Sequence, residues 1–108
     1  MIVDVFMPQN ARNLDQANDQ FLASLQRSNP TIKVVRSRVQ TRVDGSPALL
    51  TEFSNDSPAG GKETDTVITL LRSNTNNELQ FFILVAPAKD MPQYDRAFQS
   101  VMNSVRLR

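Results

Sequence analysis

The sequence predicts an α+β domain in which an antiparallel β-sheet is sandwiched between two helices (α/β/α), in the order β-α-β-β-β-β-α. One observation is the run from Leu79 to Val85, which is apolar at almost every position. Successive side chains of a strand point to opposite faces, so this strand needs cover on both sides, and we expect it at the centre of the sheet. The others are two amphipathic helical patterns and hairpin-length connections between the later strands, which make those strands antiparallel. If both helices lay on one face, Phe81 and Phe82 would not both find cover.

The first quarter of the chain predicts a strand and a helix. Residues Ile2–Phe6 read as a strand that ends at Met7-Pro8. Asn13 is placed as the N-cap of a helix, with Gln16 three residues later in a capping-box arrangement. The helix ends at Asn29-Pro30, because the residue before proline is disfavoured in the α region. Its apolar stripe consists of Leu14, Ala17, Phe21, Leu22 and Leu25.

The next segment predicts a β-hairpin. Ile32–Val43 alternates, and Asp44-Gly45 is a strong hairpin turn because both residue types tolerate positive φ. The return strand is Ala48–Ser54. The alternation predicts Val35, Val39 and Val43 on one face and Arg36, Arg38, Gln40 and Arg42 on the other.

The second half predicts a loop, another hairpin and a helix. Ser54–Gly61 is a loop by composition. The strands Thr64–Ser73 and Glu78–Ala86 follow, joined by the turn Asn74–Asn77. The last helix starts with Asp90 as N-cap and Pro92 in its first turn. Its expected apolar face consists of Tyr94, Ala97, Phe98, Val101, Met102 and Val105.

The composition limits the chemistry of the chain. With 108 residues it fits one domain, and with no His and no Cys it excludes thiol catalysis, Ser-His-Asp catalysis and zinc bound by His or Cys. The net charge of +1 gives no electrostatic case for nucleic acid. No apolar run approaches the roughly 20 residues that span a bilayer, so we expect no membrane insertion by this segment. No metal or cofactor is expected.

Two groups of charged residues are candidate binding sites. Arg36, Arg38 and Arg42 form a row along one strand, which suits an anion but more often marks a solvated face or a charge-protected sheet edge.

The other group surrounds the glycines of the polar loop. Asp56, Glu63 and Asp65 flank Gly60-Gly61, and carboxylates of this kind bind calcium, but their spacing matches no EF-hand and fits an exposed turn as well. A small-ligand or ion-binding domain that uses residues 54–65 is the alternative function. An enzyme would need a carboxylate pair in a cleft, and these three residues are the only candidates.

Three stretches carry a family resemblance: Arg27–Pro30 running into Val34–Ser37, Ser54–Gly61 with Lys62–Asp65, and Phe98–Arg106. Together they resemble a C-terminal domain of bacterial zinc metallopeptidases of the HtpX-like, HExxH type, and the last stretch is similar to the PsbP-like fold. The resemblance implies an accessory module, periplasmic or secreted as part of its parent protein. It carries over no peptidase residue, because the chain has no histidine.

The leading interpretation is a non-catalytic interaction domain of a larger bacterial protein. The chain opens directly in a predicted strand, which suggests a piece of a longer polypeptide. The expected partner is a protein or the rest of the parent chain.

Overall fold

The computed structural model describes residues 1–58, 60–72 and 77–107. Its elements are β1 (Ile2–Phe6), α1 (Leu14–Ser28), β2 (Lys33–Val43), β3 (Ser46–Asp56), β4 (Lys62–Leu71), β5 (Leu79–Pro87), a 3₁₀ turn at Ala88–Asp90 and α2 (Met91–Ser104). The predicted turn at Asn74–Asn77 lies, except for Asn77, outside the described residues.

The five strands form one antiparallel sheet with the order β1-β5-β4-β3-β2. The predicted α+β class, with an antiparallel sheet and two helices, is confirmed. The expectation that the strand of Leu79–Val85 is central was wrong, because β4 is the middle strand and β5 lies between β4 and β1. β5 still needs cover on both faces, since Phe82 packs in a cluster with α2 and Phe81 packs against the cluster of α1.

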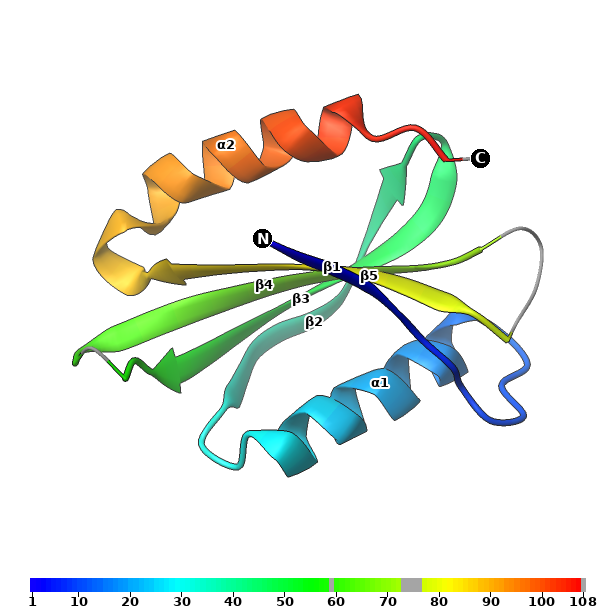
Figure 1. Cartoon of the computed structure of the whole chain (residues 1–108), viewed down its shortest axis with the longest axis horizontal. Coiled ribbons are helices and arrows are strands. Elements are labelled where there is room, and N and C mark those ends of the chain that lie inside the picture. The colour runs from blue at the N-terminus through cyan, green and yellow to red at the C-terminus, as the bar shows by residue number, and fades with distance from the viewer. Residues whose placement is uncertain (59, 73–76, 108) are drawn as a thin grey trace.

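Helix α1 covers one face of the sheet (Figure 1). Its Phe21 and Ala17 pack with Phe53 of β3, Val67 of β4 and Leu79 of β5. Phe6 of β1 packs against the same cluster, whereas no residue of β2 belongs to it. Val34 of β2 is accordingly 45% exposed although it pairs with buried Phe53. On this face β2 therefore lies outside the cover of the helix.

Helix α2 covers the other face of the sheet (Figure 1). Phe98 and Met102 pack with side chains of β2 to β5, among them Val43 and Phe82. Val3 of β1 pairs with Phe82 and so points to this face, yet it is 48% exposed. The predicted sandwich is thus incomplete, because each helix leaves one edge strand uncovered.

Part of the predicted apolar face of α2 is exposed. Tyr94 and Val101 are 43% and 42% exposed, so the expectation that both belong to the core was wrong. The helix turns the flank that carries Asp95 towards β2, where this carboxylate acts on the charge of Arg36. Tyr94 and Val101 lie on the opposite flank, which follows from the 100° of rotation per helical residue.

The predicted start of α1 is confirmed. The Gln16 backbone N–H donates to Asn13 Oδ1 at 2.9 Å, and Gln16 Oε1 accepts from the Arg12 backbone N–H at 2.9 Å. The first bond satisfies a donor that the first turn of a helix leaves without an intrahelical partner, and the second returns to the residue before the N-cap rather than to Asn13 itself. At the other end, the Asn29 backbone N–H donates to the Leu25 carbonyl at 2.9 Å.

The predicted start of α2 is confirmed in position, because Asp90 is the N-cap residue and Pro92 lies in the first turn. Asp90 makes no side-chain capping bond, because it closes the 3₁₀ turn that runs directly into the helix. By contrast, the predicted Asp44-Gly45 turn has φ of 48° and 80° at its two central residues, as a two-residue hairpin requires.

In the described part of the chain, α1 has 15 residues and α2 has 14, and neither helix is long and apolar enough to cross a membrane.

Candidate functional site

The acidic residues that the sequence assigned to a loop lie in strands. Asp56 is the last residue of β3, and Glu63 and Asp65 belong to β4, so the connection is shorter than the predicted Ser54–Gly61. Gly60 and Gly61 have φ of 95° and 77° and lie in the connection between Asp56 and Lys62. The ladder between β3 and β4 continues to the pair of Asp56 and Lys62, because polar strand ends still gain backbone hydrogen bonds there.

These carboxylates do not converge on one point. Lys62 Nζ lies 2.5 Å from Asp56 Oδ1, and this hydrogen bond lowers the pKa of Asp56. Glu63 and Asp65 are two residues apart on β4 and so share a face of the sheet. Among the described residues no group of three or more acidic side chains could hold a metal ion. The geometry therefore gives a carboxylate pair and a separate ion pair, which is too few oxygen ligands for the six to eight that calcium takes.

Asp65 is the most perturbed of the described acids. Burial, together with a hydrogen bond and the negative charge of Glu63, raises the pKa of Asp65 to about 7. Its Oδ1 atom is buried without a hydrogen-bond partner. Asp65 can therefore keep its proton close to neutral pH, although neither it nor Glu63 lines the two hollows described below.

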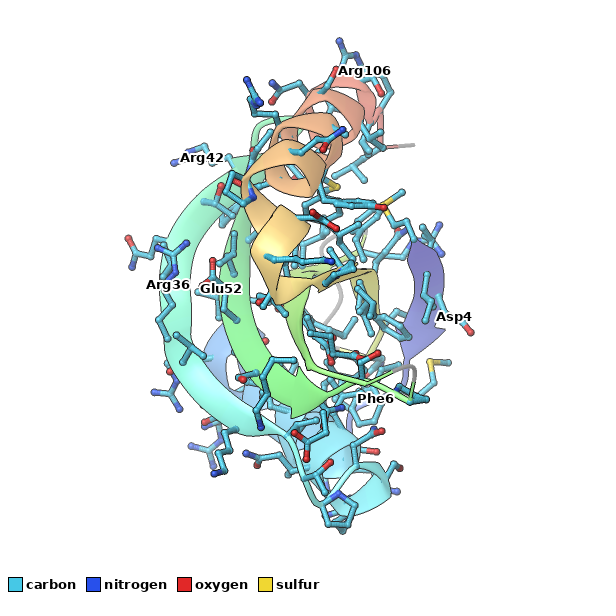
Figure 2. The ribbon with its side chains drawn as sticks, turned by 90° about the vertical axis from the view of Figure 1, so that its left-hand side faces the viewer. Asp4, Phe6, Arg36, Arg42, Glu52 and Arg106 are labelled. Carbon is cyan, nitrogen blue, oxygen red and sulfur yellow. The ribbon has the colours of Figure 1, made fainter. Side chains whose placement is uncertain are left out.

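The predicted row of arginines is broken. The register between β2 and β3 shifts between Val34 and Arg36 and again between Arg36 and Val39, so β2 contains extra residues. Each β-bulge reverses the alternation of the side chains that follow it. Arg36 therefore pairs with Glu52 and lies on the same face as Val39, which pairs with Leu50. The prediction that Arg36 and Arg42 share a face was wrong, and Figure 2 shows Arg36 beside Glu52 with Arg42 farther along the strand.

Two of the three arginines are held by carboxylates. Arg36 Nη2 lies 2.6 Å from Glu52 Oε1, and the hydrogen bond and charge of Glu52 raise the pKa of Arg36. Arg38 Nη2 donates to both carboxylate oxygens of Asp19, each at 2.5 Å, and this contact raises the pKa of Arg38. No ion pair among the described residues includes Arg42, whose Nη1 donates to the Gly45 carbonyl at 3.0 Å.

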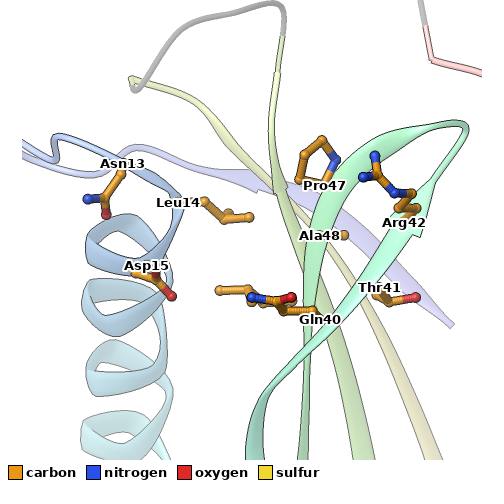
Figure 3. Close-up of a pocket in the computed structure, with 9 residues that line it drawn as sticks. Asn13, Leu14, Asp15, Gln40, Thr41, Arg42, Pro47 and Ala48 are labelled. Atoms are coloured by element: carbon orange, nitrogen blue, oxygen red, sulfur yellow. The ribbon is translucent and has the colours of Figure 1, made fainter.

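A groove lies between α1 and the part of β2 that α1 leaves uncovered. Its larger hollow has a volume of about 510 Å³ and separates the start of α1 from the β2–β3 hairpin (Figure 3). The α1 wall is formed by Asn13, Leu14 and Asp15. The opposite wall and the floor are formed by Gln40, Thr41, Arg42, Pro47, Ala48 and Leu49.

A second hollow of about 400 Å³ continues along the same two elements. Leu22, Ala23 and Gln26 of α1 face Val34 and Ser37 of β2. Asp19 and Arg38 line it as well, and their ion pair joins α1 to β2. Because α1 and β2 run in opposite directions past each other, the two hollows follow one another between the same two elements, and we call them together the α1–β2 groove. Its length along α1, from Asn13 to Gln26, is about 20 Å at 1.5 Å per residue.

No protein-family model matches the chain, and no significant match was found among the curated proteins. The candidate site consequently depends on geometry and chemistry alone.

Buried polar groups under α1 lie next to this groove. Asn18 is one residue from Asp19 and is fully buried, and its Oδ1 accepts from the Thr69 hydroxyl at 2.7 Å. Asn18 Nδ2 and Thr51 Oγ1 are buried without a partner in the described structure. An unsatisfied buried polar group costs about 1–3 kcal/mol, so this polar cluster fixes α1 at a cost in stability.

Sequence reasoning missed most of the groove. Of its residues only Arg38 and Arg42 were candidates, because the walls come from segments that are far apart in the chain. A weak signal was present, since Asp15 and Asp19 lie four residues apart on α1 and therefore on one side of it. The residues of β2 that face these two carboxylates could not be inferred without knowing where the bulges of β2 lie.

The conformation of Arg38 leads to a first prediction. Arg38 has φ of 55°, in the left-handed region that glycine adopts without strain. We expect Arg38→Gly to unfold at a higher urea concentration than Arg38→Ala, although both variants lose the contact with Asp19. Asp19→Ala removes that contact without changing the backbone, so it provides the reference. Equal midpoints for the glycine and alanine variants would contradict a strained bulge.

Proposed function

We propose that this chain is a non-catalytic interaction domain of a larger bacterial protein and that the α1–β2 groove is its contact surface. The observation that carries the proposal is the composition of the groove. Its walls combine apolar side chains such as Leu14 and Leu49 with the amides of Asn13 and Gln40, a mixture suited to recognition. The chain has no His or Cys to act as a nucleophile or base, and the paired acids Glu63 and Asp65 lie away from the groove.

The parent protein that fits this role is an HtpX-like zinc metallopeptidase located outside the cytoplasm. The support is the sequence resemblance, which implies an accessory module with a PsbP-like fold. The peptidase site would lie elsewhere in the parent. This domain would then dock the rest of the parent chain or a protein partner.

The proposal is tested by binding and by size. An antibody to the domain should detect a native polypeptide much larger than 12.1 kDa in extracts of the source organism. The remainder of that polypeptide, expressed separately, should bind the isolated domain in a pull-down or by calorimetry. A groove variant with Asp15→Lys and Gln40→Glu should weaken this binding at least tenfold, because it changes the charge of both walls.

Arg106→Glu is the matched control, since Arg106 is exposed beyond the end of α2 on the other face of the sheet. Equal loss of binding in both variants would show that the groove is not the contact surface. A native polypeptide of fragment size would contradict the accessory role altogether.

A further inference from the structure

The larger hollow of the α1–β2 groove has charges of opposite sign on its two walls. Asp15 lies on the α1 wall, and Arg42 lies beside Pro47 on the hairpin wall (Figure 3). Arg36 and Arg38 each have a carboxylate partner, whereas no ion pair of the described residues involves Arg42 or Asp15. Asp15 acts on the charge of Arg38 without forming an ion pair with it, and Arg42 donates to the Gly45 carbonyl. The hollow therefore presents one cationic and one anionic group to a ligand without an ion pair between them.

The rest of the lining is suited to a peptide. Leu14, Leu49 and Pro47 offer apolar surface for a side chain. The amide of Gln40 can donate and accept hydrogen bonds, and that of Asn13, whose Oδ1 caps α1, offers its N–H donors. Peptide groups need such two-sided partners, since each carries one N–H donor and one C=O acceptor. The volume of about 510 Å³ lies within the range of small-ligand sites.

The length of the groove also favours an extended chain. About 20 Å corresponds to roughly six residues at 3.3–3.6 Å each. The second hollow contributes the apolar side chains of Leu22, Ala23 and Val34. The ion pair of Arg38 with Asp19 crosses between α1 and β2, so a bound chain would lie over it.

From these features we propose that the α1–β2 groove binds an extended peptide whose carboxylate contacts Arg42 and whose neighbouring cationic side chain contacts Asp15. A planar guanidinium is matched to a carboxylate in geometry as well as charge. The carboxylate comes either from the C-terminus of the peptide or from an acidic side chain, and the experiment separates these sources. An inorganic anion is the poorer match, because Asp15 would repel it. The proposal rests on the proposed function as a binding domain and gives the chemistry of its ligand.

The test is an NMR titration of the ¹⁵N-labelled chain with three tetrapeptides. The first is acetyl-Ala-Lys-Ala-Leu with a free C-terminus, the second is its C-terminal amide, and the third is the amide of acetyl-Ala-Lys-Glu-Leu. We expect the first peptide to shift the backbone amide signals of Leu14, Gln40 and Leu49 and the second to bind at least fivefold more weakly. Binding of the third peptide more strongly than the first would assign the carboxylate to a side chain, and equal binding would show that either source contacts Arg42.

Variants connect the binding to the two charges. Arg42→Gln should weaken the binding of the first peptide at least fivefold and should leave the binding of the second peptide, its C-terminal amide, unchanged. Asp15→Asn should weaken the same peptide but not acetyl-Ala-Ala-Ala-Leu, which has no cationic side chain. Arg106→Gln is the control with one arginine removed elsewhere. The spectrum of each variant shows directly that it is folded.

Three results would overturn the inference: equal binding of the acid and amide peptides, signal changes outside the groove, or shifts at the groove produced equally by phosphate. Binding of the parent remainder distinguishes this failure from a failure of the proposed function. If the parent binds through the groove while none of the peptides does, the interaction role stands and the ligand chemistry is wrong. If neither binds, both are wrong.

Discussion

Phe21→Ala is expected to lower the free energy of unfolding by about 3–5 kcal/mol, the range for removing a large buried aromatic side chain. Phe21 is 4% exposed, and its ring centroid lies 4.4 Å from that of Phe81 and 5.4 Å from that of Phe6. It thereby links α1 to both β5 and β1. Its loss leaves a cavity at the point where α1 is fixed to the sheet, and chemical denaturation measures the change.

A second substitution on α1 tests whether the aromatic cluster is what anchors the helix to the sheet. Leu22→Ala is the control, because Leu22 is the next residue of α1, is only partly buried and lines the second hollow. We expect it to cost about 1 kcal/mol, well below the range for a fully buried leucine. If the two variants had equal stability, the aromatic cluster would not be the main anchor of α1.

Local sequence signals predicted those parts of the fold that depend on neighbouring residues. Asn13 and Gln16 mark the start of α1 because their side chains bond to backbone groups within four residues. The turn at Asp44-Gly45 has two positive φ values, which few other residue pairs tolerate. In both cases the interaction that determines the structure is contained in a short segment, so the sequence is sufficient to identify it.

The faces of β2 could not be predicted in this way. A period of two applies only while each residue pairs with one partner, and the bulges around Arg36 break that condition. A glycine in the sequence would have indicated the second bulge, but the residue with left-handed backbone there is Arg38. The partner of this left-handed residue lies outside the strand, because Arg38 forms an ion pair with Asp19 of α1. The two shifts cancel each other, so the alternation was wrong at Arg36, which lies between them, and correct from Val39 onwards.

Polar composition misplaced the end of β3 for a related reason. Ser54, Asn55 and Asp56 resemble loop residues, yet they pair with β4 as far as Lys62. Strand preference reflects the neighbouring strand as much as the residue itself, and that neighbour is not visible in a local window. The groove is a stronger example, since its walls bring together residues 13–26 and 34–49. Its charges were in the sequence, but their arrangement on opposite walls depends on how α1 crosses the sheet.

The second large effect is expected at Asp65, where Asp65→Asn should stabilise the protein at neutral and alkaline pH. The pKa of this carboxyl is raised from 3.8 to about 7 in the folded state, so the folded state holds a proton that the unfolded chain releases. The free energy of unfolding of the natural protein therefore falls as pH rises from about 4 to 7 and then levels off. Asparagine carries no charge at any pH and avoids this loss. The gain above pH 7 should be on the order of 1–2 kcal/mol, because water screens a half-buried group.

Urea denaturation of both proteins between pH 3 and pH 9 measures this effect. The difference between Asp65→Asn and the natural protein should vanish near pH 3, where Asp65 is protonated in both states, and should be complete above pH 7. Glu63→Gln should give a smaller gain over the same range, since it removes one negative charge but not the burial of Asp65, which is the larger cause. A difference that does not change with pH would show that Asp65 titrates normally. A gain for Glu63→Gln as large as that for Asp65→Asn would mean that the neighbouring charge, rather than burial, raises the pKa.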